Sequence, residues 1–159
     1  MAVLLAVVAG QGYQPVDVTP EIDPVYTESD PDTLLVCPDG TTPRMTEDEL
    51  RRQLEAWLGD LVDQDVSGAT EVTLLERPAE LRYPRRPLAG YKAGHVVVMM
   101  LIENDGTVPG VLVNCSSDPL YEASAVEFVS GYRFSPATLH GKPIRSNGRQ
   151  PIDFGLPSR

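Results

Sequence analysis

Residues 96–102 read VVVMMLI, a run of seven apolar residues on which the interpretation of the whole chain depends. A short continuous apolar run is typical of a β-strand that is covered on both faces. Asn104, Asp105 and Gly106 follow it, and the Asp-Gly pair favours the positive-φ positions of a hairpin turn. Residues 108–113 are again largely apolar and predict the returning strand. The C-terminal half is therefore expected to contain an antiparallel sheet.

A helix and one further strand are predicted after this hairpin. Pro119 suits the first turn of a helix, and apolar residues recur until Gly131, which ends it. The last strand places alternate apolar residues on one face: Ile152, Phe154 and Leu156. Pro151 has no N–H to donate, so this strand is expected at a sheet edge. The predicted fold class is α+β, a two-layer domain with a three-stranded antiparallel sheet and helices packed on it.

The N-terminal half is acidic and contains one predicted amphipathic helix. Residues 1–80 hold 17 Asp and Glu against 4 Arg, whereas residues 81–159 hold 6 acids against 9 Lys and Arg. Thr46 and Glu49 form a capping-box pattern that starts a helix of about residues 47–63. Its apolar face is made by Leu50, Leu54, Trp57, Leu58, Leu61 and Val62. Either this half is a solvated spacer, or it folds onto the mildly basic half.

Residues 1–12 begin with an apolar run that is too short to span a bilayer but has the length of a signal-peptide core. No Lys or Arg occurs before Arg44, so the usual basic start is missing. We expect an exported, periplasmic protein with a signal segment at 1–12. If the true start lies upstream of Met1, so that a longer signal or a membrane anchor has been trimmed, the absence of basic residues would be explained equally well.

No chemistry of catalysis or metal binding is indicated. The two cysteines, Cys37 and Cys115, are not in a CxxC pattern, and a disulfide between them and a buried free thiol at Cys115 are both open. His95 and His140 are too few for a histidine-rich metal site. Without a nucleophile elbow, a phosphate loop or a basic patch, we expect no enzyme, no cofactor, no small-molecule substrate and no nucleic-acid partner.

The order of several weak motifs from residue 81 to residue 156 resembles the C-terminal domain of TonB energy transducers. The motifs are Tyr83-Pro84, Gly94, Asp105-Gly106, Ser116-Ser117, Tyr132-Arg133-Phe134, Pro136, Gly141-Lys142-Pro143 and Phe154. The resemblance implies a TonB C-terminal-like domain at 79–159, preceded by an acidic extension at 13–78. Full transducers of that family also carry a membrane helix and a long Pro-rich spacer, a pattern that this sequence does not show.

The resemblance implies a periplasmic binding module of a Gram-negative bacterium, linked to TonB-dependent transmembrane transport. Such domains engage a short peptide of outer-membrane transporters, the TonB box, by adding it as a strand to the last strand of the sheet. The peptide-binding residues carried over are Tyr83, Pro84, Arg133, Ile152, Asp153, Phe154, Gly155 and Leu156. A purely structural role for Tyr83 and Arg133 is an equal alternative.

A second function remains open beside the first. The chain would then be a standalone envelope protein whose N-terminal half covers the sheet and its edge, with no energy-transducing role. Its partner would be another envelope protein or, in a homodimer, a second copy of the chain.

Overall fold

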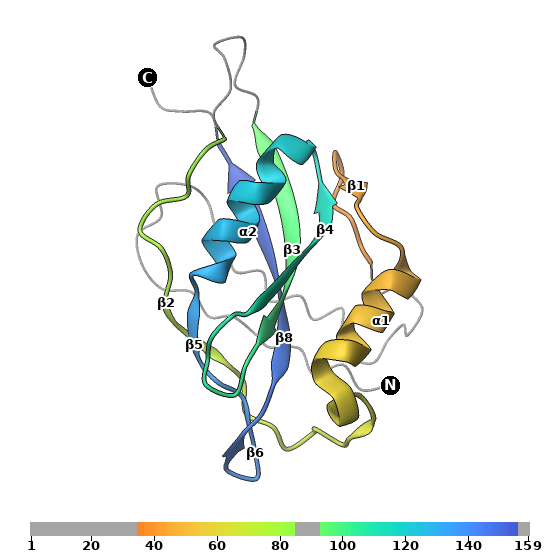
Figure 1. The fold of residues 1–159 in the computed structure, drawn as a ribbon, viewed down its shortest axis with the longest axis vertical. Helices are drawn as coiled ribbons and strands as arrows, with labels where there is room; N and C mark the ends of the chain where they lie inside the picture. Colours follow the sequence, from red (N-terminus) through yellow and green to blue (C-terminus); the bar gives the residue numbers. More distant parts are fainter. Residues whose placement is uncertain (1–34, 85–92, 156–159) are drawn as a thin grey trace.

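The computed structural model describes residues 35–84 and 93–155, and its centre is a four-stranded antiparallel sheet (Figure 1). The strands are β1 (Thr42–Pro43), β3 (Gly94–Ile102), β4 (Gly110–Ser116) and β8 (Ser146–Phe154). Their order across the sheet is β1-β4-β3-β8, so β3 is flanked on both sides by paired strands. This position explains the apolar run, because all residues of β3 except His95 are buried.

The expectation of three strands was wrong, since β1 adds a fourth. Thr42 and Pro43 pair with Ser116 and Cys115 of β4. A strand of only two residues, one of them a proline, is too short to show the alternation of apolar and polar residues by which a strand is recognised in a sequence. The last strand also begins earlier than its alternating part, at Ser146, and ends at Phe154. Leu156 lies outside the described residues.

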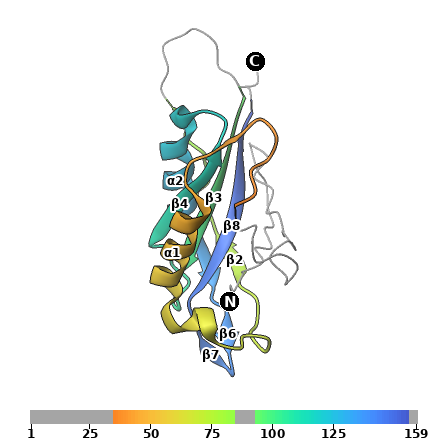
Figure 2. The same cartoon turned by 90° about the vertical axis from the view of Figure 1, so that its right-hand side faces the viewer.

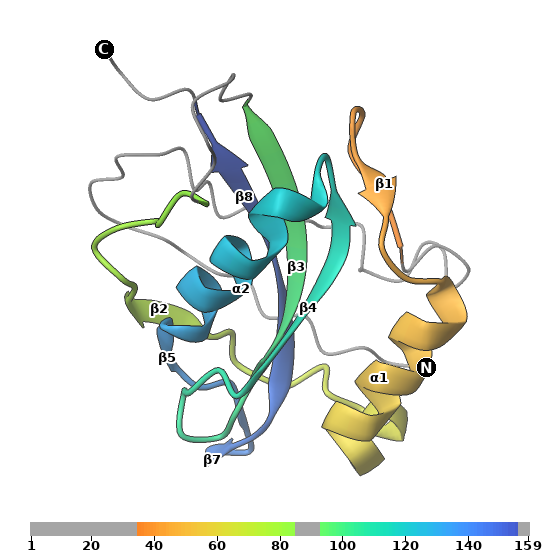
Figure 3. The same cartoon turned by 45° about the horizontal axis from the view of Figure 1, so that its top comes forward.

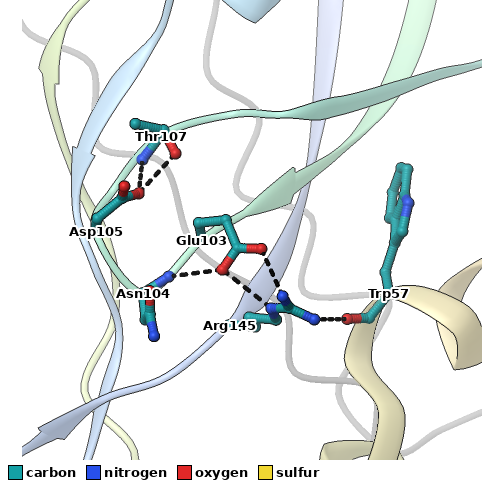
Figure 4. Close-up of polar contacts among 6 residues, drawn as sticks. All are labelled: Trp57, Glu103, Asn104, Asp105, Thr107 and Arg145. Carbon is teal, nitrogen blue, oxygen red and sulfur yellow. Dashed lines mark hydrogen bonds and ion pairs between the residues drawn. The ribbon is translucent and has the colours of Figure 1, made fainter.

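The hairpin between β3 and β4 is confirmed. Gly106 has a φ of 84°, and a Cβ there would lie 1.8 Å from the main-chain oxygen of Phe134. Asp105 closes the turn by accepting hydrogen bonds from the N–H (2.9 Å) and the hydroxyl (2.6 Å) of Thr107 (Figure 4). These bonds favour the carboxylate and hold the pKa of Asp105 below its usual value.

Helix α2 (Glu122–Ser130) packs on one face of the sheet, after the short helix η3 (Pro119–Tyr121). It forms a layer beside β3 and β4 in both of two perpendicular views (Figures 1 and 2). The core of this face, the α2-side core, consists of buried apolar residues. They are Val72, Leu81, Val96, Val98, Met100, Ile102, Val108, Tyr121, Ala125, Phe128, Val129, Tyr132, Phe134, Ala137, Ile152 and Phe154.

Helix α1 (Glu47–Leu58) packs against the opposite face at Met99 and continues as the 3₁₀ helix η2 (Gly59–Asp63). The predicted helix and its capping box are confirmed: Thr46 Oγ1 accepts from Glu49 N–H, and Glu49 Oε2 accepts from Thr46 N–H. Figure 3 shows α1 and α2 on either side of β4. The contacts of α1 form the α1-side core: Leu50, Leu54 and Met99, with Leu35, Met45, Trp57 and Leu112 packed around them.

Two small sheets complete the fold. Strand β2 (Thr73–Glu76) pairs with β5 (Arg133–Ser135), and β6 (Thr138–Leu139) pairs with β7 (Lys142–Pro143). Within the described residues, no helix is both long and apolar enough to cross a membrane.

Candidate peptide-binding edge

The four-stranded sheet ends in β1 on one side and in β8 on the other, and β8 is the longer of these two strands. It is therefore the better candidate for strand addition. It pairs with β3 over nine positions, from Gly94 opposite Phe154 to Ile102 opposite Ser146. In the part of the chain that the structure describes, β3 is the only strand paired with β8, so β8 ends the sheet on that side. A strand in this position has a second row of N–H and C=O groups that point away from its partner, which is what strand addition requires.

The side chains of β8 alternate between the two faces of the sheet. Ile152 and Phe154 lie in the α2-side core, where they are at most 1% exposed. Asp153, between them, faces the other way and pairs with His95 Nδ1 across the strand. These side chains are therefore engaged within the molecule, and what this part of β8 can present to a partner is mainly its backbone.

Tyr83 is placed at the end of β8. Its ring lies edge-on to Phe154, with 5.5 Å between the ring centres, and Phe154 also packs on Tyr121 at 4.7 Å. Partial burial raises the pKa of the Tyr83 hydroxyl, and a hydrogen bond with the main chain of Gly155 works against this rise. Three of the residues named from the sequence, Tyr83, Phe154 and Gly155, thus come together, with Pro84 half-buried beside them.

Arg133 is placed in a different sheet. It lies on β5 opposite Glu76 of β2, and its Nη1 donates a 2.8 Å hydrogen bond to the main-chain oxygen of Tyr132. Its charge also helps to lower the pKa of Asp105 in the β3–β4 turn. The structure gives Arg133 a local structural role and puts it in neither of the strands that form the β8 edge.

The first half of β8 carries polar residues that are almost fully buried. Ser146 and Asn147 are 0% exposed, Gln150 is 1% exposed and Arg149 is 7% exposed. Asn147 donates to the sulfur of Met99, and Gln150 Nε2 donates to the main-chain oxygen of Pro151 at 3.0 Å. Since buried polar residues give no apolar alternation, sequence reasoning missed this part of the strand.

Two arginines connect β8 to the N-terminal half of the chain. Arg149 Nη2 donates a 2.9 Å hydrogen bond to the main-chain oxygen of Val36. Arg145, next to the strand, pairs with Glu103 at 2.9 Å and donates to the main-chain oxygen of Trp57 at the end of α1 (Figure 4). Neither residue was singled out from the sequence, where an isolated arginine carries no signal of its partner.

A disulfide provides the third connection. Cys37 and Cys115 are bonded, with their Cα atoms 5.6 Å apart, so the segment before β1 is fixed to the end of β4. Cys115 is fully buried, as expected for a residue in a central strand. The disulfide, β1 and α1 together hold residues 35–58 against the central sheet.

The C-terminal half of the chain matches a known protein family. Residues 79–156 match the family described as Gram-negative bacterial TonB protein C-terminal. A search of curated proteins found no match to the chain. The matched region contains β3, β4, α2 and β8 but not β1 or α1. Members of this family are periplasmic protein-interaction domains rather than enzymes, and they contact envelope proteins such as outer-membrane transporters. Residues 79–156 of this chain therefore form a domain of the TonB C-terminal family.

Proposed function

We propose that this protein is a periplasmic binding module that takes up an extended peptide by β-strand addition at β8. The TonB box of an outer-membrane transporter is the proposed peptide, which would link the protein to TonB-dependent transport. The observation that carries the proposal is the position of β8, which pairs with β3 over nine residues and ends the sheet of a TonB C-terminal domain.

The backbone of β8 is the proposed binding element. The side chains of Ile152 and Phe154 face the core. The outward-pointing N–H and C=O groups of alternate residues within 152–156 would form the ladder with the peptide. Pro151 lacks an N–H and marks where that ladder would stop. Tyr83 and Pro84 would contact the peptide at the end of the strand, whereas Arg133 would act only through its charge.

The proposal is tested with a TonB-box peptide that is methylated on alternate backbone nitrogens. In strand addition only every second peptide N–H points at the accepting strand. Methylation of one set should abolish binding, and methylation of the other set should leave it within a few-fold. NMR titration of the ¹⁵N-labelled protein gives both the affinity and the amides that shift. If both sets bind equally, or if no peptide binds at millimolar concentration, strand addition is the wrong mechanism.

A second candidate function is favoured by the packing of α1. Leu50 and Leu54 of α1 bury Met99 on the face that α2 leaves open, and the disulfide fixes the preceding segment. These contacts support a standalone envelope protein whose N-terminal half covers the sheet, with no energy-transducing role. Its partner would be an envelope protein or a second copy of the chain. A protein that binds no TonB-box peptide but associates with itself in sedimentation experiments would favour this candidate.

A further inference from the structure

Strand β4 has an outer edge that β1 covers only at one end. Strand β1 pairs with β4 at Ser116 and Cys115, and the N–H of Arg44 adds one bond to the main-chain oxygen of Asn114. The chain then turns away from the sheet into α1. Within residues 35–84 and 93–155, no strand pairs with the outer side of the remaining part of β4.

The backbone groups on this outer side belong to Val111 and Val113. The main-chain oxygen of His95 accepts from the N–H of the residue that follows β4, so His95 and every second residue after it on β3 point at β4. Met99 is one of these residues, and its partner Leu112 therefore points back at β3. Val111 and Val113, both half-buried, direct their N–H and C=O groups outward. This arrangement is what strand addition uses.

A groove of about 450 Å³ adjoins this edge, a volume typical of ligand sites in proteins. Figure 3 shows α1 on one side of β4 and α2 on the other. The apolar lining of the groove is Met45 and Leu112, and the polar lining is Arg44, Glu49, Arg52 and Gln53. Leu112 belongs to the TonB C-terminal domain, whereas the other lining residues belong to the N-terminal extension. The groove is therefore built jointly by the two halves of the chain.

Arg52 is the charged group of the groove that is left for a partner. Glu49 is engaged in the cap of α1, and Arg44 pairs with Glu122 at 2.6 Å. Arg52 is exposed and donates from Nε to the main-chain oxygen of Asp48 at 3.3 Å. Its charge lowers the pKa of Glu49, but among the described residues its guanidinium forms no ion pair. A carboxylate is the group that a guanidinium in this position binds best.

We propose that this groove is a second strand-addition site, which takes an extended segment of a partner protein that has apolar residues and one carboxylate. The segment continues the position that β1 holds beside β4 and pairs with Val111 and Val113. It places an apolar side chain on Met45 and Leu112 and its carboxylate on Arg52. A second folded copy is the less suitable occupant, because it would bring its own α1 into the same groove. The site is independent of β8, which ends the sheet on the opposite side.

The test uses the full-length ¹⁵N-labelled protein and two blocked hexapeptides of valine and threonine, one with a central aspartate and one with a central lysine. Hydrogen exchange of the β4 amides is measured with and without peptide. At a concentration of about ten times the Kd, the aspartate peptide should slow the exchange of Val111 and Val113 about tenfold, because about a tenth of the protein is then unbound. The N–H of Leu112 already bonds to β3 and should be unaffected, which makes it the internal control.

A charge exchange tests the role of Arg52. Arg52→Glu should weaken binding of the aspartate peptide about threefold and strengthen binding of the lysine peptide by a similar factor. A general change of the fold could not produce this reversal of preference. Arg82→Glu makes the same change of net charge at an exposed arginine outside the groove. It is the matched control and should alter neither affinity.

Three outcomes would overturn the proposal. If Val111 and Val113 are as strongly protected as Leu112 in the free protein, the edge is already covered. If the aspartate peptide leaves both amides unchanged at millimolar concentration, the groove takes no strand. If their protection rises with protein concentration in the absence of peptide, the occupant is a second copy of the chain.

The position of the protected amides separates this site from the function proposed for β8. Slower exchange at Val111 and Val113, without any effect on residues 152–155, supports the second site by itself. Slower exchange at residues 152–155 alone supports binding at β8 and removes the second site.

Discussion

The two faces of the central sheet are covered in different ways by the two halves of the chain. The α2-side core is large and aromatic, and all of its residues except Val72 lie within the TonB C-terminal domain. The α1-side core is small, and its helix comes from residues outside that domain. It is supplemented by a disulfide and by arginine contacts to main-chain oxygens. The domain is thus stabilised from within on one face and by its N-terminal extension on the other.

The disulfide gives the strongest test of how firmly the extension is attached. It joins residues 78 positions apart, and the chain-entropy model assigns about 4 kcal/mol to closing a loop of this size. We expect the double variant Cys37→Ala, Cys115→Ala to lose about that much free energy of unfolding in urea denaturation. The wild-type protein under reducing conditions is the control and should lose a similar amount. An unchanged stability would mean that α1 and β1 alone hold the extension.

Met100 probes the α2-side core. It is fully buried on β3 among residues of that core. Met100→Ala removes buried apolar surface and leaves a cavity, so we expect a loss of about 3 kcal/mol in the free energy of unfolding. Met45→Ala, at a half-buried position of the α1-side core, is the control and should cost clearly less. Equal losses from both variants would contradict the view that the α2-side core dominates stability.

Met99, the next residue, tests whether the two cores are separate. It faces α1, where it packs with Leu54. In a double-mutant cycle, Met99→Ala and Leu54→Ala should be coupled by about 1 kcal/mol because their side chains share one core. Met100→Ala and Leu54→Ala, on opposite faces, should be additive to within about 0.5 kcal/mol. Coupling of Met100 to Leu54 would show that the sheet transmits packing changes between its faces.

The sequence predicts the elements that local rules govern. The capping box at Thr46 and the turn at Gly106 depend on residues within a few positions of each other, and both are found as expected. Strand β1 and the first half of β8 could not be predicted, because their pairing depends on partners more than 40 residues away. Polar residues such as Asn147 are buried there without any alternation to reveal it.

The candidate site was predictable to the extent that it follows the family pattern. The resemblance named Tyr83 and Phe154 together, and the structure puts their rings 5.5 Å apart. It also named Arg133, which lies on the small β2–β5 sheet. The contact between Arg149 and Val36 was missed, because it joins the family domain to an extension that the family pattern does not include.

The cap of α1 provides the smallest perturbation of the extension alone. Thr46→Ala removes the hydroxyl that accepts from Glu49 N–H, and we expect a loss of about 1 kcal/mol in thermal or urea unfolding. Peptide binding at β8 should be unchanged, because Thr46 is the N-cap of α1 and lies outside the family domain. A larger loss, or a change in peptide affinity, would mean that the cap affects the sheet as well as the helix.

The hydrogen bonds of the same cap also make the stability of the protein depend on pH. Hydrogen bonds from Thr46 lower the pKa of Glu49 below its usual value of 4.5. A carboxyl whose pKa is lowered by folding stabilises the protein above its unfolded pKa, and this contribution is lost as the pH falls through the folded value. Glu49→Gln should therefore lower the melting temperature at pH 7, and the difference from wild type should shrink below about pH 4.5. A difference that stays constant down to pH 3 would assign the effect of Glu49 to packing rather than to its charge.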